Sequence, residues 1–110
     1  MQNRYYIYQL MDGKDMRPYW FASYAELRSK ELEPAFSNYE RVYSADLHHS
    51  MTLNNIFRIF NLERPSDFFG HSLSVSDVIV ISRGGVVTAH YVDSFGFKEL
   101  PGFVAEDFET

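Results

Sequence analysis

The segment spanning residues 70–97 constrains the fold most, because it joins two strand-like runs through a pair of glycines. Residues 78–81 form a continuous apolar run, which is typical of a strand buried on both faces. Gly84 and Gly85 follow at once, and adjacent glycines adopt the positive φ angles of a tight hairpin turn without steric cost. Residues 86–93 then alternate in character, as a returning antiparallel strand does. The segment therefore predicts a β-hairpin as the structural spine of the chain.

The rest of the chain alternates predicted strands with short helices. Ser23 and Glu26 have the spacing of a capping box at the start of a helix. Apolar residues at three- and four-residue spacing predict the main helix, capped by Ser50 or Thr52. A strand over residues 16–21 would have to lie at a sheet edge, because it contains Pro18. The expected strands are 4–10, 16–21, 39–47, 78–81, 86–93 and 95–100, the helices 24–30 and 53–61, with one helical turn at 68–69.

These elements predict the α+β fold class: a small curved, mostly antiparallel sheet with one main helix and one or two short helices. A length of 110 residues fits a single domain covering residues 1–110. A domain of this size buries roughly two-thirds of the surface of its unfolded chain, which is enough for one core. The acidic residues 105–110 are expected to form a flexible tail.

Charge and composition disfavour several classes of function. The formal net charge is −5, and the ten basic residues are scattered among acidic ones, which disfavours binding to nucleic acid. The chain has no cysteine, so it has no disulfide framework and no thiolate metal site. No apolar run approaches the roughly 18–20 residues of a membrane helix. We therefore expect a cytoplasmic protein without a membrane span.

The serines, histidine and aspartate of residues 71–77 resemble catalytic chemistry at first sight. In an extended segment, however, His71 and Ser72 project to opposite sides and cannot pair as base and nucleophile. Aspartate side chains commonly accept hydrogen bonds from backbone N–H groups in turns. We therefore predict no catalytic residue here, and structural turn roles for Asp77, Gly84 and Gly85.

The four histidines do not form a metal-binding pattern. His48 and His49 are adjacent, and neighbouring residues rarely converge on one ion. His90 and Asp93 fall on opposite faces of their predicted strand. His71 and His90 meet only if the strand register brings them together. We expect no metal and no cofactor.

The aromatic residues give the strongest functional hint. Eight tyrosines and ten phenylalanines are many for this length, and those at the N-terminal end cannot all point inward at alternating positions. Exposed tyrosine and tryptophan favour protein interfaces. The alternative is a core whose tyrosine hydroxyls reach its rim. The predicted interaction surface consists of Tyr5, Tyr6, Tyr19 and Trp20.

Several motifs of this chain resemble the YodL-like family of small bacterial domains. They are the string GHSLSVSDV at 70–78, YVDSFGF at 91–97, YQL at 8–10, residues 39–43, and NLERPSDF at 61–68. The resemblance spans nearly the whole chain. It implies a domain that is often encoded on conjugative elements, with no established enzymatic activity, cofactor or catalytic residue.

The leading hypothesis is a non-enzymatic protein-interaction module of a bacterial mobile element. It leaves the protein partner and the oligomeric state unknown. One alternative is a nucleic-acid-binding, small barrel-like domain, which rests on fold analogy alone. Another is an unrecognised enzyme that uses His71, Asp77 or His90 as acid–base groups, which a cleft containing two of them would favour.

Overall fold

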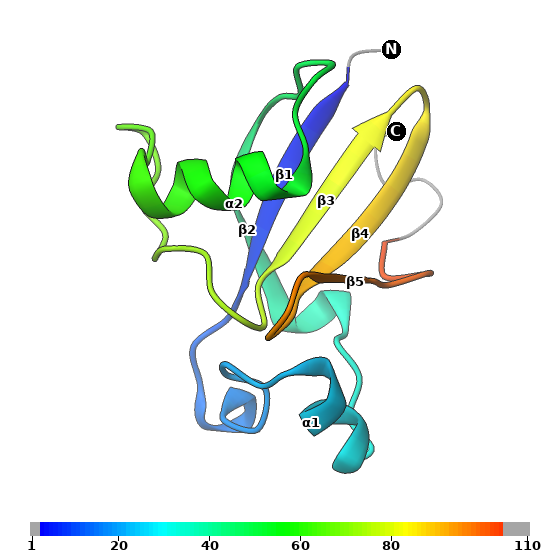
Figure 1. Cartoon of the computed structure of the whole chain (residues 1–110). Helices are drawn as coiled ribbons and strands as arrows, with labels where there is room; N and C mark the ends of the chain where they lie inside the picture. The colour runs from blue at the N-terminus through cyan, green and yellow to red at the C-terminus, as the bar shows by residue number, and fades with distance from the viewer. Residues whose placement is uncertain (1–2, 105–110) are drawn as a thin grey trace.

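The computed structural model describes residues 3–104 and contains one five-stranded antiparallel sheet in the order β2-β1-β3-β4-β5 (Figure 1). Two α-helices and two single turns of 3-10 helix complete it. The predicted α+β class is confirmed. No helix of the described part is long and apolar enough to cross a membrane. The elements are β1 (Arg4–Leu10), α1 (Tyr24–Ser29), β2 (Tyr39–Asp46), α2 (Leu53–Leu62), β3 (Val78–Arg83), β4 (Val86–Val92), β5 (Phe97–Glu99) and the 3-10 turns Lys14–Met16 and Phe36–Asn38.

The hairpin of β3 and β4 forms as the glycine pair predicts. Gly84 and Gly85 have φ angles of 59° and 83°, so both central residues of the turn lie in the region that favours glycine. β3 also pairs with β1, where Ile7 lies opposite Ile79. The central strands β1 and β3 therefore have hydrogen-bonded neighbours on both sides, and they hold the buried centre of the sheet.

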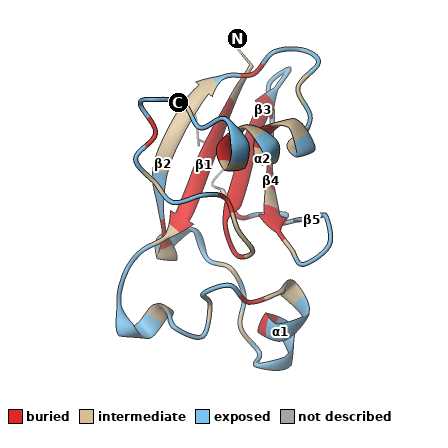
Figure 2. Ribbon diagram, turned by 60° about the vertical axis from the view of Figure 1, so that its left-hand side comes forward, coloured by how far each residue is buried: buried red, intermediate tan, exposed pale blue. Residues whose placement is uncertain are grey.

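Side-chain alternation along β1 divides the core into two clusters, one on each face of the sheet. Tyr5 and Ile7 point to the face covered by α2, where Ile56 and Phe60 are fully buried (Figures 1 and 2). The ring of Phe60 makes edge-to-face contacts with three aromatic rings at centroid distances of 4.8–6.1 Å. This arrangement is the preferred geometry of aromatic pairs. α2 is thereby fixed to the sheet.

The opposite face of the sheet carries the second cluster, to which the segment after β5 contributes, while α1 lies beyond the end of the sheet (Figures 1 and 2). Tyr6 and Tyr8 of β1 point to this face and pack in one cluster with Leu27 of α1 and Phe103. The buried tyrosine hydroxyls find partners at the edges of the cluster. That of Tyr91 donates to the backbone carbonyl of Ala22 at 2.6 Å, which ties the loop before α1 to β4.

Both α-helices begin at the residues that the sequence indicates. Ser23 and Glu26 form the reciprocal hydrogen bonds of a capping box. Thr52 caps α2, with Asn55 at the reciprocal position. Thr52 is one of the two caps considered from the sequence.

Two predicted elements are wrong, and one lies outside the described residues. Residues 16–21 form turns instead of a strand, because the chain tightens into a 3-10 turn at Lys14–Met16 and Pro18 lacks a backbone donor for a sheet. The Tyr19 N–H bonds locally to the Met16 carbonyl. Residues 68–69 do not form a helical turn, because the chain turns earlier, at residues 66–67, where the Phe68 N–H donates to the Pro65 carbonyl. The expected tail at 105–110 is not described.

Replacing Phe60 tests the packing of α2 on the sheet. The substitution Phe60→Ala should lower the free energy of unfolding by about 3–5 kcal/mol, because it leaves a cavity among rings that cannot all collapse into it. The matched control is Leu62→Ala on the same helix, where the side chain is 76 % exposed, and the expected change is within about 0.5 kcal/mol. Urea denaturation followed by circular dichroism gives both values. Equal losses would show that α2 is not anchored through Phe60.

Candidate functional site

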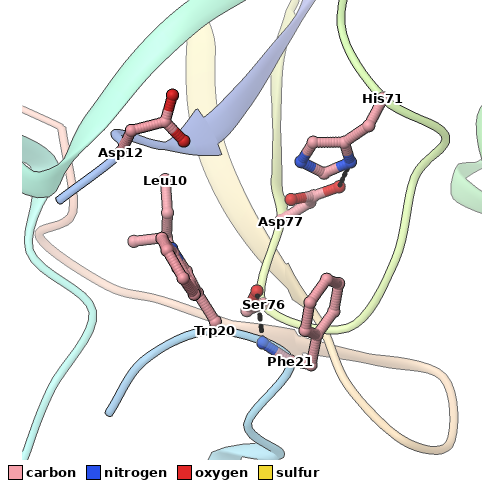
Figure 3. A pocket seen from close by; sticks show the side chains of 7 residues that line it. All are labelled: Leu10, Asp12, Trp20, Phe21, His71, Ser76 and Asp77. Atoms are coloured by element: carbon pink, nitrogen blue, oxygen red, sulfur yellow. Dashed lines mark hydrogen bonds and ion pairs between the residues drawn. The ribbon is translucent and has the colours of Figure 1, made fainter. Parts of the chain in front are cut away.

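A pocket of about 240 Å³ opens between two long loops at the end of the sheet (Figure 3). One loop connects β1 to α1, and the other connects α2 to β3. Polar and aromatic side chains therefore meet from segments that are far apart in sequence. The pocket is lined by Leu10, Asp12, Trp20, Phe21, His71, Ser76 and Asp77.

The carboxylate of Asp77 is the most deeply buried polar group of this pocket, with the residue only 1 % exposed. Its Oδ2 accepts hydrogen bonds from the Ser74 N–H at 3.0 Å and from the Gln9 side chain at 3.2 Å. The Asp77 N–H in turn donates to the Ser74 carbonyl. Asp77 thus holds the turn that leads into β3.

Burial raises the pKa of the Asp77 carboxyl to about 7, because the low-dielectric surroundings disfavour its charge. The Ser74 N–H, the charge of His71 and the Gln9 amide act against this rise in pKa and lower it in part. A carboxyl group whose pKa lies near neutrality is typical of functional sites, and buried structural networks can produce one as well.

His71 brings a second titratable group to the same pocket. Its Nδ1 lies 3.9 Å from the Asp77 Oδ2. The same nitrogen lies 2.8 Å from the Ser72 carbonyl oxygen, an acceptor, and 3.1 Å from the Gln9 amide nitrogen, a donor, so its role depends on the tautomer of the ring. The Gln9 amide donates to the His71 carbonyl at 2.8 Å and so connects the end of β1 to the α2–β3 loop. The imidazole itself is more than half exposed and accessible to a ligand.

Two residues with strained backbones meet at the floor of the pocket. Phe21 has a φ angle of 55° and Ser76 one of 91°, and residues other than glycine rarely adopt such positive φ angles. The Phe21 N–H donates to the Ser76 Oγ at 3.2 Å (Figure 3). The Tyr39 hydroxyl donates to the Ser76 carbonyl at 2.6 Å. Strain of this kind persists only where surrounding contacts fix it, and it concentrates at functional sites.

The predicted interaction surface is wrong for two of its four residues. Tyr5 and Tyr6 are each only 5 % exposed. The reason is that the sheet carries a cluster on each face, so adjacent residues of β1 are buried on opposite sides. The alternative considered from the sequence, tyrosines in the core, holds for both.

The other two residues of that surface lie in the loop before α1. Tyr19 is half-buried against the cluster that contains Leu27 and Tyr91, whereas Trp20 is 40 % exposed and lines the pocket. Gly84 and Gly85 form the hairpin turn and do not line this pocket.

The structure separates the histidines that were considered together. His90 lies beside a different hollow, near Met51 and Arg83, and its ring contacts the Thr88 hydroxyl at 2.8 Å. His71 and Asp77, in contrast, share the pocket. Within residues 3–104 no three histidine, aspartate or glutamate side chains gather in a way that could hold a metal ion.

Four residues of the site were not predicted from the sequence: Gln9, Leu10, Asp12 and Phe21. Gln9 is a buried polar residue within an otherwise apolar strand, and this break in the pattern was a signal. Asp12 looked like part of a turn, and Phe21 like the end of a strand. No residue close to either of them in the sequence indicates that the α2–β3 loop contributes to the same pocket.

The pH dependence of stability should reveal the buried Asp77. Between about pH 4 and pH 7 the unfolded chain releases this proton while the folded chain keeps it, so the free energy of unfolding falls as pH rises. The Asp77→Asn variant lacks this titration. Wild type should therefore lose stability relative to the variant across this window, in urea denaturation at several pH values. Parallel profiles would show that the folded pKa is not raised.

Comparison with family models gives a match to the YodL-like domain over residues 4–103. The match includes every strand, both helices and all the residues that line the pocket. Comparison with curated proteins and with solved structures gives no match. Because the matched region covers nearly the whole chain, this protein belongs to the YodL-like domain family.

Proposed function

We propose that this domain is a non-enzymatic protein-interaction module of a bacterial mobile element that acts in the cytoplasm. The observation that carries the interaction role is the pocket in which the strained Phe21 and Ser76 contact each other beside the exposed Trp20. The mobile element is an implication of the family resemblance. The partner is a protein that remains to be identified.

Exposed aromatic side chains support an interface at this end of the molecule. Trp20 is 40 % exposed, Phe21 is 67 % exposed, and both line the pocket. Phe69 is almost fully exposed beside an adjoining hollow that shares His71 with the pocket. Aromatic residues are enriched where proteins bind one another, and a few of them supply most of the binding free energy.

Nucleic-acid binding is less well supported by this site. Two of the lining residues, Asp12 and Asp77, are acidic, and His71 is the one histidine among them. The lining contains no lysine or arginine. Phosphate contacts need clustered basic side chains. The pocket is therefore poorly suited to a polyanion.

An enzyme is the second candidate, because the pocket brings together His71 and Asp77 at 3.9 Å and burial raises the pKa of Asp77. Acid–base catalysis needs such groups within reach of a substrate. Among residues 3–104, however, no hydroxyl is hydrogen-bonded to this pair as an activated nucleophile would be. The Ser76 Oγ accepts the Phe21 N–H and lies at the strained floor of the pocket. The geometry supports binding better than covalent chemistry.

Replacing Trp20 tests the proposed interface. With the full chain as bait in a native lysate of its host, one protein should co-purify in constant ratio and bind again when purified alone. Trp20→Ala should weaken that purified interaction roughly thirtyfold, which corresponds to the about 2 kcal/mol of an interface hot spot. Isothermal titration calorimetry measures the affinity.

The matched control is Phe95→Ala, since Phe95 is 96 % exposed and does not line the pocket. This variant should bind as wild type does. Equal binding by wild type and Trp20→Ala would show that the pocket is not the interface.

A substrate screen separates the proposal from the enzyme alternative. Wild type should show no turnover of chromogenic esters, phosphate esters or glycosides above that of Asp77→Asn, because the site has no activated nucleophile. Absorbance assays at pH 6, 7 and 8 cover the range in which Asp77 titrates. Turnover by wild type that Asp77→Asn abolishes would overturn the non-enzymatic assignment.

A further inference from the structure

We propose that the pocket binds one lysine side chain of the protein partner, with its ammonium group at the Asp77 carboxylate and its alkyl stem against Trp20 and Leu10. This inference rests on the proposed function and names the group that the interface recognises.

One oxygen of the Asp77 carboxylate accepts hydrogen bonds from the fold, and the other is directed to the pocket. Both hydrogen bonds that the described residues donate to it, from Ser74 and Gln9, end on Oδ2. His71 also approaches that oxygen. Figure 3 shows the other oxygen pointing to the side on which Asp12 and Trp20 lie. A ligand cation would therefore meet Oδ1.

The charge of the lining favours a cation. Asp12 lies on the side of the pocket opposite His71 and adds a second carboxylate (Figure 3). Its side chain is exposed, so it acts near the mouth while Asp77 acts in the depth. Burial removes water from the Asp77 carboxylate, and a hydrogen-bonded ammonium group compensates that loss.

The hydrogen bonds of Asp77 favour an ammonium group over a guanidinium group. Arginine binds a carboxylate best with two parallel hydrogen bonds, one to each oxygen. Because Oδ2 already accepts two hydrogen bonds, only single-oxygen contact is left. The lysine ammonium is a compact point charge, whose three donors can reach Oδ1 and neighbouring acceptors separately.

The walls of the pocket suit an alkyl stem. Leu10 is half-buried, and the aromatic residues Trp20 and Phe21 also line the pocket. Lysine buries its methylene groups along apolar surface while its charge reaches a polar partner. A tryptophan ring also attracts a nearby cation. The pocket thus combines the features that a lysine side chain requires.

Fluorescence gives a direct test, because Trp20 is the single tryptophan of the chain. The probe is a blocked glycine peptide with one central lysine, titrated into the full chain. We expect a saturable change in emission with lysine and none with Nε-acetyllysine or norleucine in its place, because these lack the charge. An arginine peptide should bind at least threefold more weakly.

Charge-removing variants locate the binding group. Asp77→Asn should weaken lysine-peptide binding at least tenfold, and Asp12→Asn, on an exposed position where folding is not at risk, at least threefold. The matched control is Asp15→Asn in the neighbouring 3-10 turn, outside the lining, which should bind as wild type does. Equal responses to lysine and acetyllysine, tighter binding of arginine, or unchanged binding by Asp12→Asn would each overturn the inference.

The two proposals can fail separately. If partner binding depends on Trp20 but the lysine peptide causes no change, the interface stands and the lysine assignment is wrong. If the lysine peptide binds but Trp20→Ala leaves partner binding unchanged, the pocket recognises the cation and the proposed interface is wrong.

Discussion

The rest of the structure depends on the burial of both faces of β1 and β3. Each strand has hydrogen-bonded neighbours on both sides, and each alternates between the cluster under α2 and the cluster on the opposite face. Five consecutive residues of β3, beginning at Val78, are buried, and so are the tyrosines of β1. A chain of this length gains enough buried apolar surface only if both faces are covered. The long loops must therefore close over the ends of the sheet.

The packing of these loops over the end of the sheet buries polar groups away from solvent. Asp77 lies one residue before β3, so its carboxylate is buried together with the strand that it precedes. Gln9, one residue from the end of β1, donates to it from the neighbouring strand. The hydrogen bonds to Oδ2 offset part of the cost of burying this carboxyl group, and the same burial raises its pKa. The stability of the fold and the chemistry of the pocket thus have one origin.

Strain at the pocket follows from the same contacts. Ser76 occupies a turn position that favours glycine, and its neighbours hold it there: Phe21 donates to its hydroxyl and Tyr39 to its carbonyl. These two contacts connect the loop before α1 and the start of β2 to the loop before β3. The pocket is therefore shaped before any ligand arrives, and a preformed site loses less conformational entropy on binding.

Local signals in the sequence were sufficient for most of the elements. The glycine pair, the apolar run from Val78 and the two helix caps predicted β3, β4, α1 and α2 at or near their observed bounds. Each depends on interactions within a few residues. The incorrect predictions have two separate causes. Residues 16–21 have strand-like composition, but local turns and Pro18 direct them into a loop. A single core on one face of the sheet cannot bury both Tyr5 and Tyr6, whereas the structure has a cluster on each face and buries both.

The sequence by itself determined the fold class, the hairpin and the family motifs, since periodicity and turn residues act over short distances. Tertiary structure alone decided that His71 and Asp77 lie together, that Gln9 joins them and that Trp20 borders their pocket. Alternation along an extended chain places His71 and Ser72 on opposite sides, but it does not determine where His71 lies relative to Asp77, six positions away across a bent loop. These contacts form because two loops pack over the end of one doubly covered sheet, a relation that no short-range pattern encodes.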